Sequence, residues 1–296
     1  MKAVTVHILN AFVNGGEGGN PAGVVLDADH FSDGLKQQIA SKVGLSETAF
    51  VSTSQTDAFK LEFFTPIRRV SLCGHATVAT FSHLMSKGLV SGHQSSMETT
   101  AGSREIFFED DAVFLQQTAP TYSVLQNGGA AVSREEVLLS LGIDASALFE
   151  GLEPTVVNTG ESFLIVPLKG RRALAELVPD FGAIQRISDA LSLIGYYAFT
   201  TETHHPDKDA GARMFAPSYG ISEESATGMA AGPLACYLHK FLGIGKPRIL
   251  IEQGFYMKPP SPSELKAELS LDFGTIEGLK VGGEAAVVNT MDMVVF

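Results

Sequence analysis

The sequence has little cysteine, an excess of acidic over basic residues and no long apolar run. Its two cysteines, Cys73 and Cys236, are too few for a disulfide framework and do not have the spacing of a zinc site. Lysine and arginine number 21 against 33 acidic residues, and the net charge of −12 argues against a nucleic-acid partner. Because no apolar run reaches the roughly 18 residues of a membrane span, no membrane partner is expected.

The first residues also lack the features of a secretory signal peptide. Val4, Val6 and Ile8 alternate with polar residues, which is typical of a strand, and no continuous apolar segment develops. Together with the low cysteine content, this pattern predicts a cytoplasmic protein.

Motifs for cofactors and metals are missing as well. Residues 14–21 are glycine-rich, but Pro21 stands where a dinucleotide-binding loop needs its last glycine, and a strand pattern follows instead of a helix. Residues 243–247 lack the first glycine and the Ser or Thr of a P-loop. His204 and His205 are adjacent but have no third ligand at suitable spacing, which favours a solvated loop over a metal site. We therefore expect no cofactor and no metal.

The chain does contain enough apolar residues to form a core. Its 296 residues suffice for one large or two ordinary domains. Within residues 72–80 (Leu-Cys-Gly-His-Ala-Thr-Val-Ala-Thr), Gly74 precedes apolar residues at helical spacing, which predicts a helix beginning near it. Small side chains in the first two turns permit close backbone approach, and the free N–H groups there suit an anion. The alternative is a tightly packed core helix without a ligand.

This stretch recurs in the second half of the chain. Residues 74–77 (Gly-His-Ala-Thr) align with residues 228–231 (Gly-Met-Ala-Ala), and a Phe-x-Pro element precedes each, at 64–66 and at 215–217. Two such spans indicate a duplicated domain rather than a solenoid. Two helices that begin at equivalent points would direct both N-termini to one ligand between the halves.

Strand and helix patterns occupy most of the remaining chain. Helices are expected near residues 33–43 and 180–193 and after a capping box at 133–136, and residues 88–103 are expected to be rich in turns. The expected strands lie at 58–64, 105–116, 155–158, 162–167, 196–200, 249–253, 264–271, 285–288 and 293–296.

Carboxylates at two places interrupt apolar patterns. In an extended segment, Glu47 shares one face with Ala49 and Val51. Either the opposite face is buried and Glu47 lies in water, or Glu47 is partly desolvated and its pKa is raised toward neutrality, as a general base requires. Glu223 and Glu224 precede the second glycine-initiated helix. They either complement its dipole, or one of them points into the same crevice as Glu47 and handles protons.

In combination, several short motifs resemble the PhzF-like family of phenazine biosynthesis, which shares its fold with diaminopimelate epimerase. The motifs are 19–22 (Gly-Asn-Pro-Ala), 46–50 (Ser-Glu-Thr-Ala-Phe), 72–77, 226–228 (Ala-Thr-Gly) and 281–283 (Val-Gly-Gly). The resemblance implies an α+β fold of two pseudo-symmetric domains, each a curved mixed or antiparallel sheet wrapped round a central helix. We place the domains at 1–118, completed by the last strand at 287–296, and at 119–286. A homodimer is also implied.

The resemblance further implies roles for individual residues. Glu47 matches the family's catalytic acid/base, His75 matches the histidine of its CGHAT motif, and Glu224 matches a position that is usually Asp. These three are the candidate catalytic residues. The candidate substrate-binding residues are Asn20, Ser46, Cys73, Gly74, Thr227, Gly228 and Met229.

The sequence departs from the family pattern at three positions. Glu224 is one methylene longer than Asp, Ser225 replaces Pro, and Met229 removes a hydroxyl that can contact the substrate or relay a proton. These departures put a phenazine precursor in question as the substrate. The epimerases use a pair of cysteines. Here Cys73 occupies one such position while Ser225 or Ala226 occupies the other, which argues against a symmetrical thiol racemase.

The resulting hypothesis is an isomerase that moves a proton on a small carboxylic acid in the cleft between the domains. Glu47 would transfer the proton, two helix N-termini would stabilise the enolate-like charge, and Glu224 and His75 would orient or relay. A catalytically inactive ligand-binding or dimeric interaction protein of the same fold is the alternative, and Met229 favours it. A third possibility is an isomerase or lyase that uses Cys73 as a weak second group.

Overall fold

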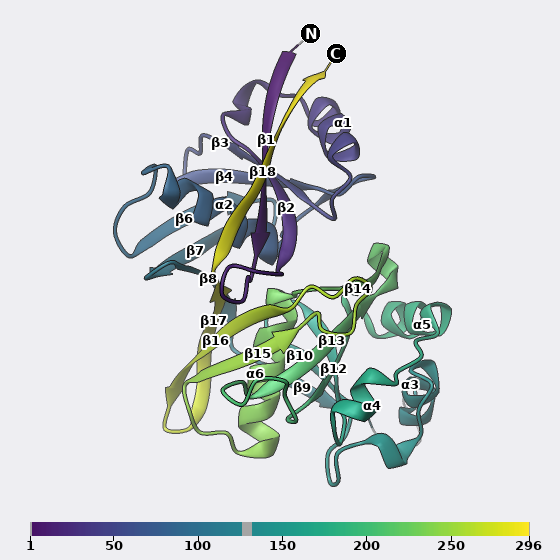
Figure 1. Cartoon of the computed structure of the whole chain (residues 1–296). Helices are drawn as coiled ribbons and strands as arrows, with labels where there is room; N and C mark the ends of the chain where they lie inside the picture. The colour runs from purple at the N-terminus through teal and green to yellow at the C-terminus, as the bar shows by residue number, and fades with distance from the viewer. Residues whose placement is uncertain (1, 126–131, 296) are drawn as a thin grey trace. The chain divides into compact units, whose positions relative to one another are not determined.

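The computed structural model describes residues 2–125 and 132–295 (Figure 1). The chain forms two compact units. Unit 1 comprises the residues up to Gln116 together with the segment from Gly282 onward, and unit 2 comprises Gln117–Val281. Both units combine many strands with few helices, which confirms the predicted α+β class.

The described residues of unit 1 form a mixed sheet and two α-helices. Its strands are β1 (Lys2–Ala11), β2 (Asn20–Val25), β3 (Thr48–Ser52), β4 (Phe59–Phe64), β5 (Arg69–Val70), β6 (Gln94–Thr99), β7 (Gly102–Glu109), β8 (Ala112–Thr118) and β18 (Ala285–Val295). Its helices are α1 (Asp33–Val43) and α2 (Gly74–Ser86), with a 3-10 turn at Ala28–His30. Paired strands follow the order β18–β1–β2–β3–β4–β6–β7–β8. The β2–β3 and β4–β6 pairs are parallel and the others antiparallel.

Unit 2 is built in the same way. Its strands are β9 (Thr121–Val124), β10 (Thr155–Asn158), β11 (Ser162–Pro167), β12 (Gly195–Thr200), β13 (Ala210–Ala216), β14 (Ile221–Glu224), β15 (Arg248–Gln253), β16 (Ser263–Asp272) and β17 (Thr275–Gly283). Its helices are α3 (Arg134–Ser140), α4 (Arg171–Ala175), α5 (Phe181–Leu191) and α6 (Gly228–Leu242), with 3-10 turns at Ala145–Ala147 and Pro217–Tyr219. The paired order includes β9–β10–β11–β12–β13–β15–β16.

The two units repeat one topology. In unit 1, the pairs β1–β2 and β3–β4 are antiparallel, and the pairs β2–β3 and β4–β6 are parallel. The same alternation occurs in unit 2, where β10–β11 and β12–β13 are antiparallel and β11–β12 and β13–β15 are parallel. The short strands β5 and β14 pair with equivalent partners, β4 and β13. Helices α2 and α6 follow these short strands in the chain. The prediction of pseudo-symmetric halves with glycine-initiated helices at equivalent points is therefore confirmed.

Helices α2 and α6 are the buried helices of their units. In α2 every residue from His75 to Leu84 is buried except Ser82, and in α6 the whole segment 230–238 is buried. Helix α2 contacts β1, β2, β3 and β18, and α6 contacts β10, β11 and β16, so each sheet wraps round its helix. Small residues such as Ala76 and Ala230 permit this close approach. No described helix is both long and apolar enough to span a membrane.

Local signals in the sequence explain several helix ends. The Ser32 hydroxyl accepts a hydrogen bond from the Leu35 N–H at the start of α1, and Gly44 ends that helix with a φ of 70°. The predicted capping box at 133–136 is present, with Ser133 and Glu136 satisfying each other's backbone N–H groups.

The strand predictions differ from the structure in three places. The segment 88–103, expected to be rich in turns, also contains the strand β6, whose polar residues gave no apolar alternation. The predicted strand 105–116 is two strands, separated by a turn in which Asp110 has a φ of 51°. The strands predicted at 285–288 and 293–296 belong, up to residue 295, to the single strand β18, which pairs with β1 from Ala11 to Lys2, and residue 296 lies outside the described residues.

A histidine pair lies inside unit 1. The ring of His83 on α2 lies 4.2 Å from the ring of His7 on β1, and neither nitrogen of His83 has a hydrogen-bond partner among the described residues. Burial, with smaller contributions from His7 and Lys87, lowers the pKa of His83 to about 4.

This lowered pKa predicts a loss of stability in acid. Between pH 6.5 and 4 the unfolded chain binds a proton at His83 that the folded chain does not, so stability falls as the pH falls through this window. At about 1.4 kcal/mol per pKa unit, the loss is on the order of 3 kcal/mol. Urea unfolding across this range should show a smaller loss in His83→Leu than in the wild type. The exposed His93 supplies the control, because His93→Leu should leave the pH dependence unchanged. An unaltered profile in His83→Leu would contradict the assignment.

Candidate active site

In unit 1, Glu47 lies directly before β3 rather than within it. Its carbonyl oxygen accepts a hydrogen bond from the Gly23 N–H at 3.1 Å, which fixes its backbone beside β2. The residue is 8% exposed, so the sequence alternative of a carboxylate lying in water does not apply. Its Oε2 atom lies 3.3 Å from His75 Nε2.

Close packing between β2 and β3 holds this backbone in place. A Cβ atom on Gly23 would come within 2.9 Å of Thr48 Oγ1, the residue that follows Glu47. Glycine at residue 23 therefore leaves room for the Thr48 side chain at the start of β3, next to Glu47.

Two further candidates surround the imidazole of His75, which is 4% exposed in the first turn of α2. The Ser46 Oγ lies 3.3 Å from His75 Nε2. The Cys73 Sγ lies 3.5 Å from His75 Nδ1 and 3.9 Å from Nε2. Cys73 is the N-cap residue of α2, but its side chain makes no capping hydrogen bond, and Gly74 follows as the first helical residue. The carboxylate, thiol and imidazole therefore gather at a helix N-terminus.

Asn20, the remaining candidate in unit 1, is the first residue of β2 and is 4% exposed. It pairs with Ala11 of β1, at the end of the glycine-rich loop. The loop thus connects two antiparallel strands, as the rejection of a dinucleotide-binding motif predicted.

In unit 2, Glu224 ends β14 and is 9% exposed. The Thr227 hydroxyl donates a hydrogen bond to Glu224 Oε2 at 2.5 Å. Thr227 is the N-cap residue of α6, and its side chain makes no capping hydrogen bond. The other acidic residue, Glu223, forms an ion pair with Arg213 at 2.8 Å. Glu224 is therefore the carboxylate that lies at the start of α6.

Two glutamines that no motif indicated hold this second cluster. Gln253, at the end of β15, donates hydrogen bonds to the Glu224 carbonyl at 2.7 Å and to Thr227 Oγ1 at 3.1 Å. It accepts one from the Tyr197 hydroxyl at 2.8 Å. Burial, with an added contribution from the charge of Glu224, raises the pKa of Tyr197 well above its usual value, so the phenol stays a donor.

The second glutamine contacts the candidates at the helix start. Gln117 donates a hydrogen bond to the Gly228 carbonyl at 3.2 Å, and its Nε2 lies 3.8 Å from Met229 Sδ. The Thr159 hydroxyl donates to Gln117 Oε1 at 2.7 Å. The only sequence signal for either glutamine is a polar residue at the end of an otherwise apolar strand.

The ligand atoms of Glu47, Cys73 and His75 all lie within 4.8 Å of one another, the one such group of possible metal ligands found in the described part of the chain. Sequence spacing gave no indication of it. The adjacent histidines of the 203–209 loop have a different role, since His204 Nδ1 lies 2.8 Å from the buried Glu252 and its ring stacks on Phe255.

Two hollows in the described part of the chain lie away from the candidate residues. One of about 350 Å³ in unit 2 is lined by residues of α3 and α5, including Glu136 and Arg186. One of about 650 Å³ in unit 1 is lined by polar residues of β6 together with apolar residues such as Phe59, Leu89 and Val90. Neither includes a candidate residue.

Comparison with known proteins gives matches along most of the chain. It is 34% identical to the uncharacterized isomerase YfhB of Bacillus subtilis over 260 residues, which are 86% of this chain and 87% of that protein. It is 30% identical to the trans-2,3-dihydro-3-hydroxyanthranilate isomerase of Pseudomonas fluorescens, with 88% of this chain and 89% of that protein covered.

Solved structures agree with these relatives. A phenazine biosynthesis protein of the PhzF family from Bacillus anthracis superposes with a TM-score of 0.89 at 27% identity, over 100% of both chains. A hydroxyproline epimerase from Agrobacterium vitis has a TM-score of 0.59 at 11% identity, over 98% of this chain and 92% of that one, which shows a shared fold alone. The fold and the relatives define an isomerase with an epimerase-like architecture. With residues 9–291 matching its model, the chain belongs to the PhzC-PhzF family of phenazine biosynthesis-like proteins.

Proposed function

We propose that the protein is a cofactor-independent isomerase that moves a proton on a small carboxylic acid, with Glu47 as the general acid and base. The observation that carries the proposal is the buried Glu47 carboxylate, 3.3 Å from His75 at the N-terminus of α2. A base enclosed in this way is shielded from competing water, and the adjacent helix end favours negative charge on a bound ligand.

The proposed reaction needs no oxidant or reductant. Glu47 takes a proton from a carbon next to the substrate carboxylate or conjugated with it, and the electron pair of the broken C–H bond delocalises into the acid. The N-terminal amides of α2, roughly half a positive charge, stabilise this enolate-like charge. Glu47 then returns the proton to a different carbon, so that a double bond moves while the composition stays constant. His75 orients the carboxylate of Glu47 or relays the proton.

The second cluster completes the proposed site. We place it across a cleft between a domain of residues 1–118, completed by 287–296, and a domain of residues 119–286. The repeated topology supports this arrangement, because it gives α6 the same place in its unit that α2 has in the other. Glu224 would take part in proton handling. The proposed substrate contacts are Asn20, Ser46, Cys73, Gly74, Thr227, Gly228 and Met229.

The proposed substrate class is a small carboxylic acid. The substrate named for the Pseudomonas relative is not assigned to this protein. At Met229 the family pattern has a hydroxyl, and a thioether cannot donate or relay a proton. A pocket that includes Met229 therefore favours an acid that places an apolar group against the Met229 side chain.

A panel of carboxylic acids tests the proposal. A ligand present at a hundred times its dissociation constant adds about 2.7 kcal/mol of stability, which a thermal shift detects. Each stabilising acid is then incubated with the protein in D₂O, and mass spectrometry follows deuterium at carbon. We expect incorporation into at least one acid. Acids that stabilise the protein but take up no deuterium would instead support the alternative, a catalytically inactive binding protein.

Cys73 defines a second candidate function, an isomerase or lyase in which its thiol acts with Glu47. The observation that favours it is the 3.5 Å contact between Cys73 Sγ and His75 Nδ1. Alkylation with iodoacetamide should abolish deuterium exchange, and a stabilising acid should protect the thiol. Cys236 is fully buried in α6, and burial raises its pKa to about 12, so it should stay unmodified. Full exchange activity after alkylation of Cys73 would remove the thiol from the reaction.

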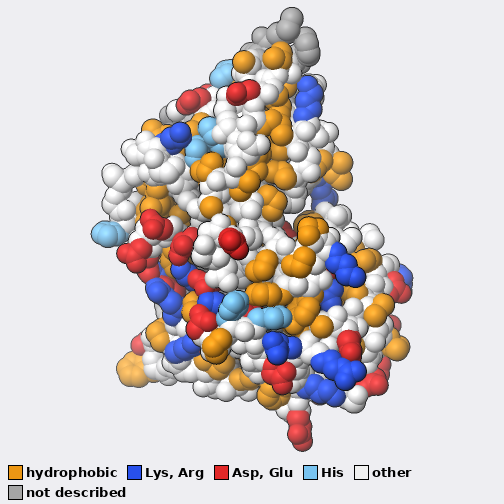
Figure 2. All heavy atoms as spheres, in the orientation of Figure 1, with side chains coloured by type: hydrophobic (Ala, Val, Ile, Leu, Met, Phe, Trp, Pro, Cys, Tyr) orange, Lys and Arg blue, Asp and Glu red, His pale blue; other side chains and the backbone are white. Residues whose placement is uncertain are grey.

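A homodimer is proposed as the assembly. Strand β18 exposes Val287, Val288 and Val294, and Figure 2 shows hydrophobic side chains on the face of unit 1 that carries this strand. A second copy that covered them would remove apolar surface from water. Sedimentation velocity should give twice the mass of the chain, and Val288→Lys should shift the distribution toward monomer. A monomer at all concentrations would contradict this assembly.

A further inference from the structure

We infer that Glu47, Cys73 and His75 form a binding site for Zn²⁺, and that the bound ion inhibits the protein by occupying the Glu47 carboxylate. The inference concerns metal binding and goes beyond the proposed function. Zinc binding does not depend on that function, because a chain without isomerase activity would present the same three ligands, whereas the inhibition rests on the proposed role of Glu47.

The distances between the ligand atoms suit the ion. Tetrahedral zinc bonds of about 2.3 Å to sulfur and about 2.0–2.1 Å to nitrogen and oxygen separate sulfur from nitrogen by about 3.5 Å and nitrogen from oxygen by about 3.3 Å. The corresponding separations are 3.9 Å between Cys73 Sγ and His75 Nε2, and 3.3 Å between His75 Nε2 and Glu47 Oε2. Because Cys73 Sγ lies nearer His75 Nδ1, at 3.5 Å, the thiol or the imidazole must rotate before Sγ and Nε2 can share one ion.

The donor types select zinc among the common divalent ions. Thiolate, imidazole and carboxylate are the three ligand types that zinc uses in proteins, whereas magnesium and calcium prefer oxygen alone. The three residues lie at the ends of buried elements of unit 1, since Cys73 and His75 lie at the start of helix α2 and Glu47 directly precedes β3.

A buried oxygen provides a second observation. Glu47 is 8% exposed, and its Oε2 accepts no hydrogen bond from the described residues, although it faces His75 Nε2. A buried carboxylate oxygen without a donor is costly, and a cation bonded to it would remove that cost. The ion would displace the proton of the Cys73 thiol to solvent, so binding should tighten as the pH rises.

Three protein ligands leave the fourth zinc position open to water or to a ligand carboxylate. With its lone pairs on the metal, Glu47 could no longer accept a proton from carbon. Zinc should therefore stop deuterium exchange by the chelator-treated protein, and excess EDTA should restore it.

Cobalt(II) provides the direct test because its spectrum reports its ligands. We expect chelator-treated, full-length protein to bind one Co²⁺ per chain, with a thiolate-to-cobalt charge-transfer band that added Zn²⁺ abolishes. The band should disappear in Cys73→Ala and persist in Cys236→Ala, the matched control at the other free cysteine. His75→Ala and Glu47→Gln should each weaken zinc binding by at least about a hundredfold. Loss of a residue that only supports a metal ligand weakens binding by up to about a hundredfold, and loss of a ligand itself should cost at least as much.

Circular dichroism of each variant separates loss of a ligand from loss of the fold. If Cys73→Ala fails to fold, Glu47→Gln and His75→Ala still test the site. A charge-transfer band that survives in Cys73→Ala, the absence of saturable binding to wild type, or zinc that accelerates exchange would overturn the inference. Because the cobalt spectrum is recorded without substrate, a failed exchange assay does not affect it.

Discussion

Glu47→Gln is expected to lower the rate of deuterium incorporation by about a hundred- to ten-thousand-fold, the typical contribution of a general acid or base. Glutamine keeps the size of the side chain but cannot accept the proton. Because residue 47 is fixed by the Gly23 hydrogen bond and the buried strand β3, the variant should keep its fold. The measurement is the exchange rate in D₂O with an acid identified by thermal shift.

Glu105→Gln is the matched control, since Glu105 is an exposed glutamate of the same unit on β7. Its exchange rate should equal that of the wild type. A folded Glu47→Gln protein that exchanges as fast as Glu105→Gln would remove Glu47 from the mechanism.

Lys36→Met is expected to destabilise the protein by about 3 kcal/mol. Lys36 on α1 is 4% exposed and forms an ion pair with Glu62 on β4, which is 7% exposed. Methionine keeps the apolar stem but leaves a buried carboxylate short of a cation. Arg69 still pairs with Glu62 at 2.6 Å, which keeps the loss at the lower end of the range for a broken buried pair. Urea unfolding measures the change.

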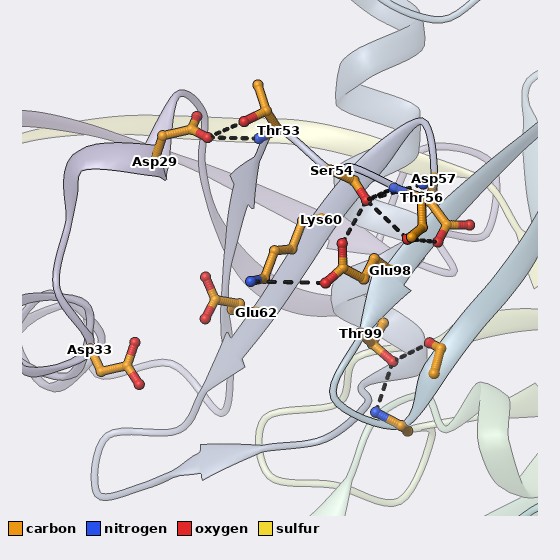
Figure 3. Close-up of polar contacts among 12 residues, drawn as sticks. Asp29, Asp33, Thr53, Ser54, Thr56, Asp57, Lys60, Glu62, Glu98 and Thr99 are labelled. Carbon is orange, nitrogen blue, oxygen red and sulfur yellow. Dashed lines mark hydrogen bonds and ion pairs between the residues drawn. The ribbon is translucent and has the colours of Figure 1, made fainter.

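The control is Lys60, which lies two residues before Glu62 on β4. Figure 3 shows Lys60 directed to Glu98, at 3.9 Å, with Glu62 beside it. Both members of the Lys60–Glu98 pair are about a third exposed, so Lys60→Met should cost about 0–1 kcal/mol. Equal losses of unfolding free energy in Lys36→Met and Lys60→Met would contradict the claim that the burial of the Lys36–Glu62 pair causes the destabilisation.

Short-range signals in the sequence predicted the elements that they control. Gly74 and Gly228 both begin the helices expected of them, and the αL residue Gly44 ends α1 as its position indicated. These features depend on residues a few positions apart, where capping and glycine geometry act. The duplication was visible because the two helix starts repeat in register.

Long-range partners were not predictable in the same way. The hydrogen bond from Gln253 to Thr227 joins residues 26 positions apart, and the bond from Gln117 to Gly228 joins residues 111 positions apart. Strand β18 pairs with the first strand of the chain, so its continuity depends on β1 rather than on its own alternation. The grouping of Cys73 with Glu47 likewise comes from the packing of α2 against β3. Only the fold brings such residues together.

A crystal structure of the protein with one of the stabilising carboxylic acids tests the central claim most directly. The account predicts a single ligand that contacts the Glu47 side chain and the backbone N–H groups at the starts of both α2 and α6. A ligand bound away from Glu47, or one that reaches only one of the two helix starts, would contradict it.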